Sequence, residues 1–130
     1  MIVVVAVSLT GGCTFKPRLI EPELGVVFDL PIGRDAEVKG EDLRLTFEEV
    51  TSDSRCPLSV ECIWAGEAVY SVLFKKDGTS RTVVFTELGL GGQGEANFLD
   101  YTITALLQPY PNQPDDIDPE DYLLRMTVNK

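Results

Sequence analysis

The residues best suited to chemistry lie in one short segment, residues 53–68, which reads DSRCPLSVECIWAGEA. Two of the three cysteines, Cys56 and Cys62, stand six positions apart in it. A tight loop can bridge that spacing, and we expect a structural disulfide between them. Free thiols or a redox pair remain alternatives, although redox pairs usually have the spacing C-x-x-C. A four-ligand zinc site of the usual composition is out of reach, because the chain has no histidine and one further cysteine.

Four other residues of the segment are expected to build its structure: Asp53, Arg55, Trp64 and Gly66. Asp53 is a turn former whose side chain bonds nearby backbone amides. Arg55 and Asp53 could bind a ligand together. The simpler interpretation is that Arg55 fixes the loop in place, by pairing with Asp53 or by donating hydrogen bonds to carbonyls. We expect the loop to press Trp64 into the core and Gly66 to let the chain turn into the next strand.

The third cysteine, Cys13, follows an apolar run that has the length of a signal-peptide core. The run Leu9-Thr10-Gly11-Gly12-Cys13 is similar to a bacterial lipobox, in which the cysteine is lipidated after cleavage. Thr10 replaces the usual leucine, and no positive charge precedes the run, so the start would lie upstream of Met1. The alternative is a buried first strand that ends in a free thiol. We expect a signal peptide at 1–12, a lipidated tether at 13–24 and one domain at 25–130.

Two loops carry residues that could hold a ligand. Spaced carboxylates bind calcium through oxygen, and a proline-rich loop holds a weak calcium candidate: Asp115, Asp116, Asp118, Glu120 and Asp121. An ordinary acidic surface loop is the alternative, since the spacing of an EF-hand is missing. The second loop contains Gly89, Gly91, Gly92 and Gly94, but no helix follows it to cradle a phosphate. It is similar to one recognition loop of the chagasin-type cysteine-protease inhibitors, whose other two loops are not found here.

Catalysis has little support in the sequence. The absence of histidine removes the usual general base and rules out Ser-His-Asp and Cys-His arrangements. A small carboxylate-dependent hydrolase remains the alternative class, and it would require two acids that face each other across a cleft. We therefore name no catalytic residue and expect no enzyme and no cofactor. Tyr110 lies between two prolines, and its side chain would either contact a partner or pack inward and hold the loop against the core.

The hydrophobic pattern indicates strands throughout the domain. Apolar residues alternate over 26–30, 43–47, 68–74 and 122–128, and β-branched residues fill 79–86 and 101–107. A short strand is expected at 36–39, a bulge at 48–50 and a hairpin turn at 76–78. These segments predict an all-β, single-domain antiparallel β-sandwich of the Ig-like or Greek-key type with about seven strands. The loop 108–121, with four prolines, is expected to cross between the sheets.

The pattern DSRCPxxVxCxWAGxA over residues 53–68 resembles a family of uncharacterised small bacterial lipoproteins. The resemblance extends over most of the mature chain. It includes the lipobox, an apolar strand from Phe28 to Gly33, the segment from Tyr101 to Pro111 and a closing strand from Tyr122 to Val128. It implies a lipid-anchored all-β envelope protein, and it carries over no catalytic residue.

The net charge of the chain limits the partners that it can bind. The 130 residues carry a net charge of −10, so nucleic acid is not expected as a partner and an anionic membrane surface is disfavoured. We expect a monomeric domain that is held by its N-terminal lipid in the bacterial envelope, at the outer membrane facing the periplasm. The expected role is a non-catalytic binding or structural module that meets an envelope protein through its loops.

Overall fold

The computed structural model describes residues 19–130, which form eight strands and one short 3₁₀ helix. Residues 1–18, including the expected signal peptide and Cys13, lie outside the described part. The elements are β1 (Phe28–Pro31), β2 (Asp35–Val38), β3 (Leu43–Asp53), β4 (Glu67–Lys76), β5 (Thr79–Leu88), β6 (Gly94–Phe98), β7 (Tyr101–Gln108), η1 (Pro119–Asp121) and β8 (Leu123–Asn129).

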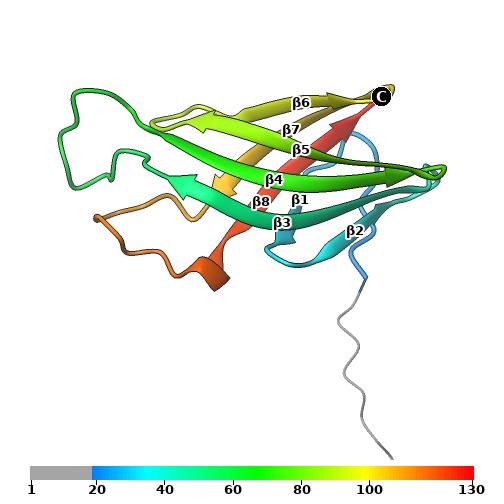
Figure 1. Ribbon diagram of the computed structural model, residues 1–130, viewed down its shortest axis with the longest axis horizontal. Helices are drawn as coiled ribbons and strands as arrows, with labels where there is room; N and C mark the ends of the chain where they lie inside the picture. Colours follow the sequence, from blue (N-terminus) through cyan, green and yellow to red (C-terminus); the bar gives the residue numbers. More distant parts are fainter. Residues whose placement is uncertain (1–18) are drawn as a thin grey trace, which may run out of the picture.

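The strands form two antiparallel sheets of four that pack face to face, as Figure 1 shows. One sheet has the order β2-β3-β4-β5 and the other the order β1-β8-β7-β6. The prediction of an all-β sandwich is confirmed. Strands β2 to β5 are neighbours in sequence order, and β1 joins the second sheet beside β8.

Alternating side chains fill the space between the sheets. On β4, the predicted inward residues Ala68, Tyr70, Val72 and Phe74 are all fully buried. Aromatic contacts hold the layers together, since the Phe74 ring on β4 stacks on Phe98 of β6 with centroids 5.2 Å apart. Ring pairs of this kind stabilise a core beyond the area that they bury.

Two local predictions about β3 and β4 are confirmed. The β3–β4 register shifts between Phe47 and Glu49, which is the expected bulge, and it shifts again between Val50 and Ser52. The β4–β5 hairpin turns at Asp77 and Gly78, which have φ of 48° and 78°. Two successive residues of positive φ match the right-handed twist of the paired strands.

Three features differ from the sequence predictions. The segment 94–98 forms a separate strand, β6, and a turn at residues 99–100 divides it from β7. The proline-rich connection after β7 does not cross between the sheets, because β7 and β8 are neighbours in one sheet. The glycine-rich residues 89–93 make a crossing instead, from β5 to β6. Small residues allow the sharp path that such a crossing needs.

Part of the expected tether belongs to the folded domain. Ile20 forms a parallel bridge with Ala36 of β2, and its carbonyl accepts a hydrogen bond from the Glu37 N–H at 2.8 Å. Pro22 accepts another from the Lys39 N–H at 2.9 Å. The chain therefore packs along the edge of β2 from Ile20, five residues before the predicted start of the domain, and this segment covers an otherwise open sheet edge.

The connections β3–β4, β5–β6 and β7–β8 lie together at one end of the sandwich (Figure 1). We call this the loop end and define it as residues 54–66, 89–93 and 109–122. It follows from the strand directions, because every second connection of antiparallel strands returns to the same end. The fold thus brings together three segments that are distant in sequence.

Candidate binding surface at the loop end

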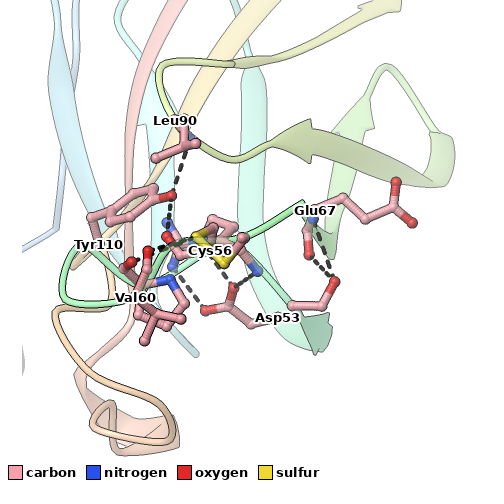
Figure 2. Close-up of a disulfide and its surroundings, with 10 residues drawn as sticks. Asp53, Cys56, Val60, Glu67, Leu90 and Tyr110 are labelled. Atoms are coloured by element: carbon pink, nitrogen blue, oxygen red, sulfur yellow. Dashed lines mark hydrogen bonds and ion pairs between the residues drawn. A yellow bond between two sulfur atoms is a disulfide. The ribbon is translucent and has the colours of Figure 1, made fainter. Parts of the chain in front are cut away.

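The β3–β4 connection is a disulfide-closed loop. Cys56 and Cys62 are bonded, with their Cα atoms 6.0 Å apart, so the predicted disulfide is confirmed. Backbone hydrogen bonds close the neck of the loop, from the Ser54 N–H to the Glu67 carbonyl and from the Cys56 N–H to the Ala65 carbonyl, both at 2.8 Å. Figure 2 shows the disulfide beside Val60 and Tyr110. The loop is fixed at its base and again across its middle.

Arg55 anchors this loop to the rest of the molecule. Its side chain is fully buried and donates from Nε and Nη2 to the two carboxylate oxygens of Asp53, each at 2.8 Å. It also donates to the Leu107 carbonyl at 2.9 Å and to the Pro109 carbonyl at 3.0 Å. The structure therefore shows both pinning contacts considered from the sequence, the pair with Asp53 and the bonds to carbonyls. No surface of Arg55 is left for a ligand.

A second buried acid, Glu87 on β5, completes the environment of Arg55. Its Oε2 lies 3.8 Å from Nη1 of Arg55, while its Oε1 accepts hydrogen bonds from the Tyr70 hydroxyl at 3.0 Å and the Leu107 N–H at 2.9 Å. Burial raises the pKa of Glu87, although these donors and the positive charge of Arg55 oppose the shift. Burial and the negative charge of Glu87 raise the pKa of Tyr70.

Asp53 stays ionised in spite of its half-buried position. Burial alone would raise its pKa, but hydrogen bonds from Arg55 and Tyr122, together with the charge of Arg55, lower it below its ordinary value. The Tyr122 hydroxyl donates to Oδ2 at 2.8 Å. Burial and this acid neighbour in turn raise the pKa of Tyr122 to about 12. Asp53 thus ties the start of β8 to the root of the disulfide loop.

Tyr110 joins all three connections of the loop end. Its hydroxyl donates to the Cys56 carbonyl at 2.7 Å and accepts from the Leu90 N–H at 3.0 Å, as Figure 2 shows. Its ring lies under the Arg55 guanidinium, 5.0 Å from the centroid. Of the two predicted roles for Tyr110, the structure shows the inward one, in which the side chain holds the loop to its neighbours.

Two glycines allow the backbones of the loop end to approach closely. Gly66 has φ of +72°, and a Cβ there would lie 1.9 Å from the Ser54 carbonyl oxygen. A Cβ on Gly89 would lie 2.2 Å from the Ala65 carbonyl oxygen, and the Gly89 N–H donates to the Gly66 carbonyl at 3.0 Å. The predicted turn at Gly66 is present, and one reason for a glycine at position 89 is this contact with the disulfide loop.

The prediction that Trp64 packs into the core is wrong. Its side chain is 62% exposed, and the neighbouring Ile63 is fully exposed at 107%. The neck bonds and the disulfide set the direction of this part of the loop, which points away from the sandwich. A hydrophobic residue beside a disulfide signals burial only where the ring faces the core, and the sequence does not show which way it faces.

Exposed apolar residues are concentrated here. Six of the eleven exposed large hydrophobic residues in the described chain lie on the loop end or directly before it: Leu58, Val60, Ile63, Trp64, Leu88 and Leu90. Single exposed hydrophobics are ordinary on protein surfaces, but a concentration of them marks an interaction site. A rigid frame beneath them reduces the ordering cost of binding. The arrangement is suited to contact with another molecule.

The acidic residues of the β7–β8 connection do not assemble into a metal site. Within residues 19–130, no three acidic or cysteine side chains are grouped so that they could hold a metal ion. Asp116 accepts backbone hydrogen bonds from Asn112 at 3.2 Å and Gln113 at 3.0 Å, which shape the loop itself. Asp115 and Asp116 border a cavity of about 230 Å³ beside Pro57 and Pro111. The weak calcium candidate gains no support from this geometry.

Two acids next to the loop end, Glu87 on β5 and Asp53 on β3, are engaged by Arg55. Glu87 is 1% exposed, and both Glu87 and Asp53 lie against the Arg55 guanidinium. A larger cavity of about 520 Å³ lies at the opposite end of the sandwich, lined by Glu37, Arg44 and the β4–β5 turn among others. Glu37 and Arg44 are partners on the adjacent strands β2 and β3, and they form a surface ion pair at 3.8 Å.

Sequence reasoning missed Glu87, and a signal for it existed. Phe85 and Glu87 alternate on the inward face of β5, so an acid in that register requires a buried partner. The buried Arg55 is that partner. Cys13, the predicted lipidation site, lies outside the described residues.

Comparisons of the chain with protein-family models, with curated proteins and with solved structures give no match. Among residues 19–130, no helix has the length and apolar character needed to span a membrane.

Proposed function

We propose that this chain is a non-catalytic binding module that contacts a protein partner through the loop end. The observation that carries the proposal is the position of Ile63 and Trp64, which are exposed on a loop that a disulfide and a buried arginine hold in place. Tryptophan is enriched among the residues that dominate binding energy, and its few rotatable bonds limit the entropy lost on contact.

The experiment is crosslinking in intact cells of the source organism, followed by capture of the full chain and mass spectrometry. The paired variant Ile63→Ser/Trp64→Ser is expected to lose the captured partner. The matched control is Val26→Ser/Val27→Ser, because these neighbouring residues are 51% and 59% exposed and lie outside the loop end. Equal capture by wild type and the Ile63/Trp64 variant would contradict the proposal.

The proposal places the module on a membrane through a lipid at Cys13, with the periplasmic side of the outer membrane as its location. The support is the lipobox-like run before Cys13 and the disulfide, which persists in an oxidising compartment. Cys13→Ser is expected to move the protein from the membrane fraction to the soluble fraction. Mass spectrometry of the mature N-terminus without an added lipid would contradict the anchor.

A second candidate is inhibition of papain-type cysteine proteases. The glycine-rich segment that is similar to a chagasin-type recognition loop is bonded to both neighbouring connections, through the Gly89 N–H and the Leu90 N–H. It therefore shares one end of the sandwich with two other loops. A titration of papain with the purified full chain tests this candidate, and full papain activity at micromolar chain would remove it.

A further inference from the structure

The charge of the loop end is one-sided. Its exposed ionisable residues are all acidic: Glu61, Asp115, Asp116, Asp118, Glu120 and Asp121. The sequence of residues 54–66, 89–93 and 109–122 contains one cation, Arg55, and this side chain is buried against Asp53 and Glu87. Within these three connections, the exposed charge is therefore negative.

Four lysines lie at the other end of the sandwich, together with acids such as Asp42, Asp77 and Asp100. Lys39 lies in the β2–β3 turn, Lys75 and Lys76 end β4, and Lys130 follows β8 at the C-terminus, which Figure 1 places opposite the loop end. The molecule is acidic overall, and these four lysines lie at the end of the sandwich away from Trp64. Such a separation orients an approaching charged partner.

This distribution of charge disfavours two simple binding partners for the exposed apolar residues of the loop end. A second copy that docked its own loop end would bring two acidic sets together, and like charges across an interface are repulsive. An anionic lipid surface would meet the same repulsion. A partner with positive charge beside an apolar contact area would meet complementary charge on the β7–β8 connection, which is bonded to the disulfide loop through the Leu58 and Ser59 N–H groups.

We propose that the loop end binds a protein surface on which lysine and arginine side chains border an apolar depression. The inference rests on the proposed binding function and adds the chemistry of the partner. The apolar residues Ile63 and Trp64 enter the depression, while the acids of residues 115–121 face the surrounding cations. Rim charges of this kind chiefly raise the rate of association and make it sensitive to salt.

The test uses a photo-crosslinking amino acid in place of Ser59, an exposed residue of the disulfide loop, in the full chain produced in the source organism. The yield of crosslinked adduct is measured for three backgrounds. The first is otherwise wild type. The second is the acid-neutral variant Asp115→Asn/Asp118→Asn/Glu120→Gln. The third is Asp42→Asn/Asp77→Asn/Asp100→Asn, which makes the same charge change in exposed turns at the opposite end.

We expect an adduct with another protein whose yield falls about tenfold in the acid-neutral variant, as loss of electrostatic steering predicts, and remains unchanged in the third background. The Ile63→Ser/Trp64→Ser pair must also abolish it. If that pair abolishes the adduct but acid neutralisation does not change it, the partner chemistry is wrong and the binding surface stands. An adduct between two copies, or with lipid, also overturns the partner chemistry. If no adduct depends on Ile63 and Trp64, both proposals fail.

Discussion

Asp53 and Arg55, two residues apart at the root of the disulfide loop, form a two-pronged ion pair in which Nε and Nη2 donate to Oδ1 and Oδ2, each at 2.8 Å. The same guanidinium donates to the carbonyls of Leu107 on β7, in the other sheet, and of Pro109 directly after β7. One side chain therefore links the β3–β4 and β7–β8 connections. Its burial explains how an exposed apolar loop is held rigidly above the core.

Removal of Arg55 is expected to be severely destabilising. Arg55→Met would leave the buried Glu87, the half-buried Asp53 and two carbonyls without their cation, and breaking one side of a buried pair costs about 3–5 kcal/mol. Arg55→Lys should lose less, because it keeps the charge but not the paired donors. Urea unfolding of the purified chain measures both variants. A loss below about 1 kcal/mol for Arg55→Met would contradict the anchoring role.

The hydrogen bond from Tyr122 to Asp53 should be visible in the pH dependence of stability. The pKa of Asp53 is lowered in the folded chain, so its contribution is complete above the unfolded value of about 3.9 and is lost as pH falls through the folded pKa. Tyr122→Phe removes one donor and should raise the pKa of Asp53, so that this loss begins at higher pH.

Carbon NMR titration of the Asp53 carboxyl group in the wild type and Tyr122→Phe checks this prediction. A site-specific signal is needed, because the raised pKa of Glu87 acts in the opposite direction: its contribution declines as pH rises through the folded pKa. The same Asp53 pKa in both proteins would show that Tyr122 does not support the carboxylate.

Loss of the disulfide should lower stability by about 2 kcal/mol, the chain-entropy value for so short a ring. The Cys56→Ser/Cys62→Ser variant should still fold, because the neck bonds and the Arg55 contacts remain. Thermal unfolding with and without reductant measures the effect on the wild type. Equal melting temperatures in the two conditions would show that the ring does not stabilise the fold.

Gly66 and Gly78 offer a matched pair of positions. Both have positive φ, but a Cβ at Gly66 would meet the Ser54 carbonyl, whereas nothing lies within 4 Å of a Cβ at Gly78. Gly78→Ala should cost about 1–2 kcal/mol from backbone strain alone, and Gly66→Ala clearly more because the strand ends must separate. Chemical unfolding of the two variants compares them. Equal losses would mean that the close approach at Gly66 is easily relieved.

Much of the fold was predictable because one face of each strand is buried. Alternation in β3, β4 and β8 gave the inward residues, and the Asp77-Gly78 turn gave the hairpin. β6 was missed as a separate strand, since its residues GEANF have weak strand character. The prediction that the proline-rich connection 108–121 crosses between the sheets was also wrong, because loop length and proline content do not specify which strands become neighbours.

The candidate site was predictable in its covalent and local parts. The disulfide and the Asp53–Arg55 pair follow from residues close in sequence. The meeting of Arg55 with Glu87 and of Tyr110 with Leu90 depends on tertiary contacts between distant segments. The outward direction of Trp64 depends on the same contacts, and hydrophobicity alone indicated the opposite.

The most direct test of the account is the fluorescence of Trp64, which is the only tryptophan of the chain. The account predicts that native Trp64 emits like a tryptophan in water, is readily quenched by acrylamide, and changes little in wavelength when the protein unfolds in urea. A shielded, short-wavelength emission in the native monomer that shifts to longer wavelength on unfolding would place Trp64 in the core and contradict the proposed contact surface.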